Sequence, residues 1–114
     1  MHRAIPVFTL LIAAFVLNAQ PPATGNPENG KRLFTAVGCY QCHGRGAQGG
    51  AAGPRLGPKV MVLPAFLIYV RHPAGAMPPY TTKVISDAAL TDIHAYIRSM
   101  PPPAKPADTP LLNP

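Results

Sequence analysis

The stretch Cys39-Tyr40-Gln41-Cys42-His43 decides how the rest of this chain has to be arranged. Its two cysteines are the only ones among 114 residues, and a histidine follows the second at once. On a helix, this spacing places the two thiols one turn apart on the same side. Thiols so placed can add to the two vinyl groups on one porphyrin edge, and the next residue can offer an imidazole to the iron. The motif therefore predicts a c-type haem attachment site.

A disulfide, a redox dithiol and half of a zinc site are the alternatives for the same residues. A thioredoxin-like dithiol belongs in a βαβ pattern, and no such pattern is visible. Zinc needs further ligands, but His72 and His94 lie much farther apart than the usual H-x-x-x-H spacing. Haem attachment is therefore the favoured interpretation.

The N-terminus has the three-part form of a secretory signal peptide. A positive start, Met1-His2-Arg3, precedes the apolar run 4–17, and Asn18-Ala19 offers a cleavage point. The run of about 14 residues is shorter than the roughly 20 that span a bilayer. We expect residues 1–19 to be the signal peptide. An uncleaved anchor is the alternative, because Leu17 is not ideal at the third position before the cut.

The composition leaves room for one small domain. Sixteen prolines and ten glycines disfavour long elements. Residues 20–25 are expected to be a flexible leader, and 101–114, with six prolines, a proline-rich disordered tail. The domain is then 26–100, about 75 residues. A core that small needs additional stabilisation, such as a covalent cross-link or a bound cofactor. A covalently held haem would supply it.

Three motifs in order resemble class I monohaem cytochromes c. They are the Cys39–His43 motif, Gly53-Pro54-Arg55-Leu56, and Met77-Pro78-Pro79-Tyr80 ahead of a last helix. The resemblance covers about residues 26–100. It implies an all-α fold of three to four short helices wrapped around one haem c, which two thioethers attach, and an electron-carrying role. Because bacterial haem attachment in that family occurs outside the cytoplasm, the expected location is the periplasm.

The first helix is predicted to begin at Asn26, a capping residue followed by Pro27. Its apolar stripe contains a glycine, Gly30, which suggests that another element comes close there. By the resemblance, this is where the first and last helices cross, and Tyr96 is the residue that packs on Gly30.

Two more helices are expected after the glycine-rich loop that follows His43. The run 64–70 could also be a buried strand, and the resemblance favours a helix. Ser86 is expected to cap the last helix, which Pro101 ends. Its core-facing stripe consists of Leu90, Ile93, Ile97 and Met100; His94 lies at the margin and is expected to be structural or exposed.

The resemblance also implies the residues around the iron. The Pro54 carbonyl would accept a hydrogen bond from His43, and Leu56 would pack on the haem face. Arg55 would neutralise a propionate or lie on the surface. With His43 on one side, Met77 would be the second axial ligand, presented by a loop that Pro78 and Pro79 stiffen.

Other side chains compete weakly for the ligand position. His72, five residues before Met77, is the main rival, although a lone histidine beside a proline is usually a surface residue. Met61 and Met100 are expected to fill space in the core.

Charge and acidic-residue content bear on the partner and on the reaction. The formal net charge is +6, and basic residues are scattered without interleaved aromatics, so a nucleic-acid partner has little support. Acidic patches on redox partner proteins are the expected docking surfaces. Contact with the membrane is expected to be transient unless the leader stays attached. The alternative is that the positive charge only keeps the protein soluble. Only four acidic residues are present, without paired carboxylates.

We therefore expect a monomeric electron carrier, or a cytochrome subunit of an oxidoreductase, rather than an enzyme by itself. The alternatives are a haem-based sensor or peroxidase-like enzyme with a labile sixth ligand, and, less favoured, a non-haem binding module.

Overall fold

The computed structural model describes residues 24–112, and their regular structure is entirely helical. The helices are α1 (Pro27–Ala36), α2 (Tyr40–His43), α3 (Leu63–Arg71) and α4 (Asp87–Arg98). Within these residues the extended pairing is limited to a single bridge between Gly50 and Gly53. The predicted all-α fold is confirmed. The expected signal peptide, 1–19, lies outside the described residues.

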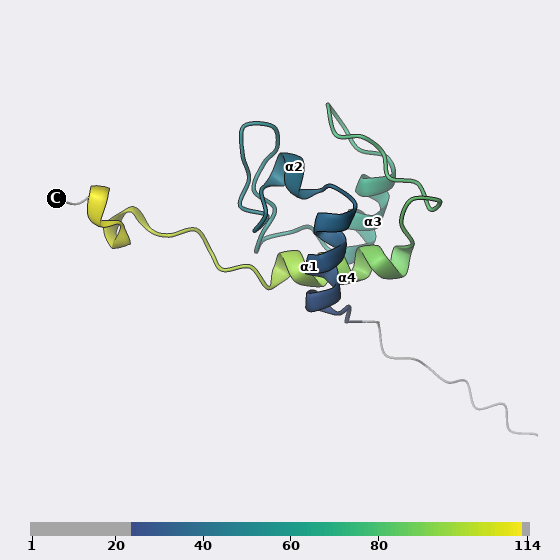
Figure 1. Ribbon diagram of the computed structural model, residues 1–114, viewed down its shortest axis with the longest axis horizontal. Helices are drawn as coiled ribbons and strands as arrows, with labels where there is room; N and C mark the ends of the chain where they lie inside the picture. The colour runs from purple at the N-terminus through teal and green to yellow at the C-terminus, as the bar shows by residue number, and fades with distance from the viewer. Residues whose placement is uncertain (1–23, 113–114) are drawn as a thin grey trace, which may run out of the picture.

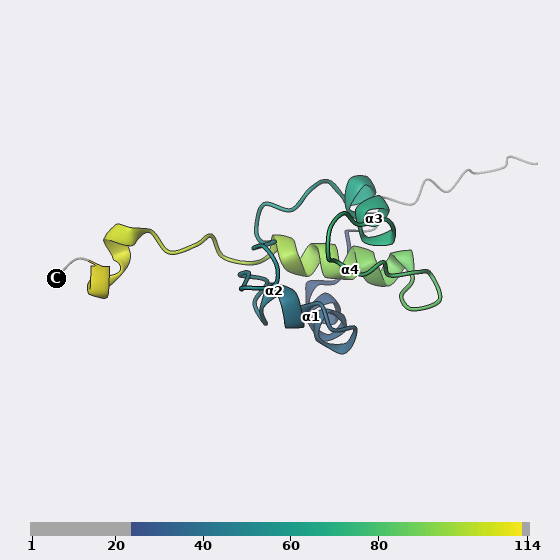
Figure 2. The ribbon, with the colours of Figure 1, turned by 90° about the horizontal axis from the view of Figure 1, so that it is seen from above.

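Helix α4 lies between α1 on one side and α3 on the other, as Figures 1 and 2 show together. Its buried side chains include Leu90, Ile93 and Ile97. Phe34 of α1 and Phe66 of α3 are also buried and complete the core from either side. None of the helices in residues 24–112 is long and apolar enough to span a membrane.

Both long helices begin at the predicted caps. The Asn26 side chain accepts hydrogen bonds from the backbone N–H groups of Glu28 and Asn29, and the Ser86 side chain accepts one from Ala89. These caps satisfy N–H groups that have no partner inside a helix. Asp92 of α4 then ties the start of α1 down, because its carboxylate accepts from the Asn26 N–H and the Asn29 side chain, each at 2.7 Å.

The crossing of α1 and α4 depends on Gly30. A Cβ there would lie 1.9 Å from the Asp92 carbonyl oxygen and 2.9 Å from the Tyr96 Cβ. The Tyr96 ring packs next to Phe34, with ring centroids 5.5 Å apart. The predicted contact between Gly30 and Tyr96 is confirmed, and it explains the glycine on a buried stripe.

One side chain, Met61, differs from expectation, and His94 takes the first of its two expected roles. Met61 was predicted to be core, but it is 43% exposed, because it precedes α3 rather than lying within it. His94 is buried; its Nε2 lies 2.8 Å from the Met61 carbonyl oxygen, and its ring packs beside Phe66. His94 is thus structural, and it attaches the segment before α3 to α4.

The tail leads away from the helices in Figure 1. It carries two single-turn 3-10 helices, η1 (Pro106–Asp108) and η2 (Pro110–Leu112), which the sequence did not indicate. A hydrogen bond from the Arg55 guanidinium to the Pro101 carbonyl, 2.9 Å long, holds the start of the tail.

Candidate haem site

The Cys39–His43 motif forms a turn of helix immediately after α1. Gly38, with a φ of +86°, reverses the chain at the end of α1 and delivers it to α2. Such a φ suits glycine, which has no Cβ to clash. Both cysteines are free thiols; Cys39 is half-buried and Cys42 is exposed. Burial raises the pKa of the Cys39 thiol to about 11. The thiol is therefore neutral near pH 7.

His43 is buried and held in one orientation. Its Nδ1 lies 2.8 Å from the carbonyl oxygen of Pro54. Since a carbonyl only accepts, Nδ1 carries the hydrogen, and the lone pair of the neutral ring is on Nε2. A metal-binding histidine is usually fixed in this way.

Gly53 lets the Pro54 loop approach the imidazole. A Cβ at Gly53 would lie 3.0 Å from both the His43 Nδ1 and the Cys42 carbonyl oxygen. The bridge to Gly50 closes this loop behind α2, and the Ala47 carbonyl accepts from the Leu56 N–H at 2.9 Å. The loop therefore fixes both Pro54 and Leu56 relative to His43.

Met77 comes from a separate loop and joins the same apolar core. Its side chain is half-buried, like Leu56, Leu67 and Tyr80, and all four pack against the buried core residues. His72, the rival ligand, is exposed at the end of α3. Of the two side chains, Met77 is thus the one that packs inward.

The residues present fit a haem bound through the motif. Two free thiols stand one turn apart, a buried imidazole offers Nε2, and half-buried apolar side chains from three segments could contact a large apolar group. Within residues 24–112, no group of three His, Cys, Asp or Glu side chains could hold a metal ion. A zinc site at Cys39 and Cys42 would therefore lack further ligands among the residues that the structure describes.

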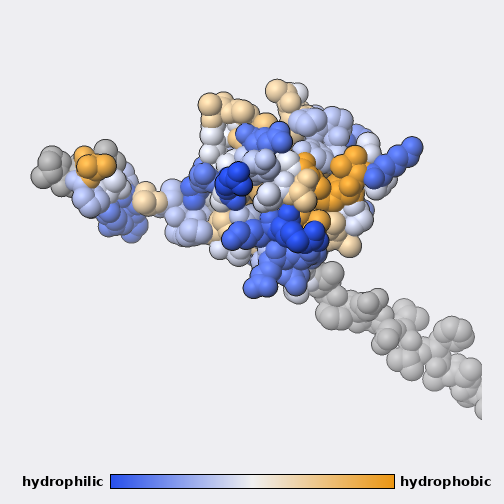
Figure 3. Space-filling model, in the orientation of Figure 1, coloured by the Kyte–Doolittle hydropathy of each residue, from blue (hydrophilic) through white to orange (hydrophobic). Residues whose placement is uncertain are grey.

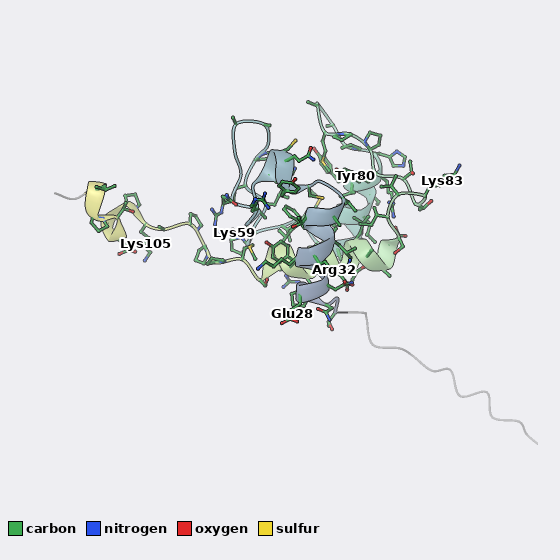
Figure 4. All side chains as sticks on the ribbon, viewed as in Figure 1. Glu28, Arg32, Lys59, Tyr80, Lys83 and Lys105 are labelled. Carbon is green, nitrogen blue, oxygen red and sulfur yellow. The ribbon has the colours of Figure 1, made fainter. Side chains whose placement is uncertain are left out.

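Tyr80 is a site neighbour that the sequence reasoning did not single out. Its hydroxyl donates to the Val37 carbonyl, 3.2 Å away, at the end of α1. Burial raises the pKa of the phenol, and the nearby Cys39 and Cys42 raise it further. The signal available in the sequence was its position three residues after Met77. Figure 4 labels Tyr80 in the upper half of the helical domain.

Arg55 is exposed, as one of its two expected roles required, and its side chain makes two hydrogen bonds to backbone carbonyls. Its Nε donates to the Gly57 carbonyl at 2.7 Å, and its other arm reaches Pro101. The guanidinium therefore ties the Pro54 loop to the start of the tail that follows α4, and the propionate role stays a prediction.

These features define a small c-type cytochrome, and comparison with known proteins agrees. A family model described as cytochrome c oxidase, cbb3-type, subunit III matches residues 25–97, so the chain belongs to this cytochrome c family. Cytochrome c-555 of Methylococcus capsulatus is 30% identical over 105 residues, which cover 85% of each chain. No solved structure shows significant similarity. Membership implies one covalently attached haem c, electron transfer and redox partner proteins.

Proposed function

We propose that this chain is a periplasmic electron carrier with one haem c held by Cys39 and Cys42, and with His43 and Met77 as axial ligands. The observation that carries the proposal is the 2.8 Å contact between the His43 Nδ1 and the Pro54 carbonyl, which leaves Nε2 for the iron. When bound, the haem supplies an iron that cycles between two oxidation states by single electrons.

The protein's part in this chemistry is to hold the ligands still. Pro54 and Gly53 fix the His43 ring, and Pro78 and Pro79 restrict the Met77 loop. Ligands held in the same place in both oxidation states keep rearrangement on electron transfer small. Leu56, Leu67 and Tyr80 pack against the same core and would limit the access of water to a bound haem. This arrangement favours a carrier over an enzyme that needs an open iron.

Location and assembly follow from the same proposal. Residues 1–19 would direct export and be removed, leaving the domain 26–100 with its flexible leader and its proline-rich tail. The family description names an oxidase subunit. The chain would therefore serve either as a free monomer or as a cytochrome subunit that delivers electrons to an oxidoreductase.

We expect that the reduced, exported protein does not bind carbon monoxide at neutral pH. The reason is that Met77 would keep the sixth position filled, whereas a sensor or peroxidase has a labile ligand there. The measurement is the visible spectrum of the reduced protein before and after saturation with carbon monoxide. Rapid carbon monoxide binding would replace the carrier with a sensor or peroxidase-like protein.

Basic side chains are spread over the surface rather than gathered in one run. Figure 4 shows Arg32, Lys59, Lys83 and Lys105 in separate parts of the molecule, and Figure 3 shows hydrophilic side chains over the front of α1 beside an apolar area. Lys31 and Arg32 are the exposed basic residues of α1. Acidic patches on the partner would match this charge.

Electron transfer to a partner with acidic patches should slow as salt rises, because screening shortens the reach of surface charges to about 8 Å at physiological ionic strength. The test is the bimolecular rate between about 10 mM and 500 mM salt, compared with the rate for a neutral small-molecule oxidant. If both rates are equally indifferent to salt, the positive charge serves solubility only.

A further inference from the structure

The main chain of Tyr80 is fastened to the end of α3 by both of its polar groups. Its N–H donates to the Val70 carbonyl at 3.1 Å, and its carbonyl accepts from an Arg71 guanidinium nitrogen at 2.6 Å. Its side chain reaches Val37 at the end of α1. Tyr80 is therefore attached at three points to two helices.

Only Pro78 and Pro79 separate Tyr80 from Met77. Each proline fixes its own φ and removes an N–H, so the link has little freedom. The segment before Met77 is a solvent-exposed turn: Ala74, Gly75 and Ala76 are exposed, and a Cβ at Gly75 would meet nothing within 4 Å. Besides its own packing against the core, the position of Met77 therefore depends on how firmly Tyr80 is held.

Arg71 connects Tyr80 to α4 as well as to α3. Its side chain is only 14% exposed, and its second terminal nitrogen pairs with the Asp87 carboxylate in the first turn of α4. The pair adds little stability, because Asp87 is 64% exposed. It does aim the planar guanidinium, which binds two acceptors at once in a way that a single ammonium does not.

We propose that Arg71 is the positioning residue for the sixth ligand. By holding the Tyr80 carbonyl, it keeps Met77 in place and so determines how easily an external ligand displaces Met77 from the iron. This inference rests on the proposed axial role of Met77. It assigns to the end of α3 a part in the site that none of the sequence motifs indicates.

The test is displacement of the methionine by imidazole in the oxidised, exported protein. Displacement is measured as the loss of the long-wavelength sulfur-to-iron charge-transfer band. Arg71→Gln is expected to tighten apparent imidazole binding about tenfold, because losing a hydrogen bond from a charged group raises the fraction of protein with Met77 released. Arg98→Gln is the matched control, since Arg98 is exposed at the other end of α4. It should leave the affinity unchanged.

A double substitution separates positioning from general loosening. In a Met77→Ala background there is no methionine to displace, so adding Arg71→Gln should change imidazole affinity, read from the visible spectrum, by less than about twofold. Circular dichroism checks that all variants are folded. If Arg71→Gln is not exported, Asp87→Asn, which removes the charge of the guanidinium's second acceptor, should shift affinity in the same direction by less.

Two results would overturn the inference: an Arg71→Gln affinity equal to that of the unmutated protein, or equal tightening with and without Met77. A different result would overturn the axial role of Met77 itself. That result is an unmutated oxidised protein without the charge-transfer band, whatever Arg71→Gln does.

Discussion

Replacing both cysteines, Cys39→Ser and Cys42→Ser, is expected to yield a colourless and largely unfolded chain. The two thiols are the sole attachment points that the sequence offers, and they lie one turn apart directly before the buried His43. Apolar side chains such as Leu56, Leu67 and Met77 are only half-buried where they pack against the core. A domain of about 75 residues without its covalent haem has too little core to fold.

The measurement is the absorbance that stays with the protein after denaturation and acid–solvent extraction, together with helix content by circular dichroism. The unmutated protein, exported with haem-maturation machinery, should stay red, and so should the control Gln41→Ala, which changes an exposed position between the cysteines. Colour that extracts freely from the unmutated protein would refute covalent attachment.

Met77→Ala is expected to abolish the charge-transfer band and to open the iron to carbon monoxide or peroxide. It should also lower the reduction potential by on the order of 0.1 V, because axial ligands set haem potentials over a range of about 0.8 V and a thioether raises them. The measurements are the oxidised spectrum, a redox titration and carbon monoxide binding.

Two other methionines serve as controls for Met77→Ala. Met61→Ala should change stability by less than about 0.5 kcal/mol, because Met61 is 43% exposed. Met100→Ala should cost about 2 kcal/mol, because Met100 is half-buried against the core. Neither should alter the spectrum. If Met77→Ala leaves the visible spectrum unchanged and His72→Ala alters it, the sixth ligand is His72.

Local sequence signals predicted well where the first and last helices begin. Asn26 and Ser86 cap because their side chains reach N–H groups two or three residues ahead, an interaction contained within a few residues. Gly30 was informative because a glycine is unfavourable within a helix unless another backbone comes close. The family resemblance added what local signals lack, namely that Tyr96 is the partner.

Contacts between loops and helices could not be predicted in this way. The attachment of Tyr80 to Arg71 and Val37 joins residues 9 and 43 positions apart. No periodicity encodes which carbonyl a guanidinium will reach. His94 lies beside the buried stripe of α4, and its burial depends on where the segment carrying Met61 passes. The exposure of Met61 has the same origin, since an apolar run outside a helix does not specify which side chains face inward.

The most direct test of the proposed His43 and Met77 ligation is the optical spectrum of the exported protein in both oxidation states. A carrier with both axial sites filled should show the weak long-wavelength band of methionine sulfur bound to iron when oxidised, and a sharp six-coordinate low-spin spectrum when reduced. A high-spin spectrum without that band in the oxidised protein would contradict this ligation.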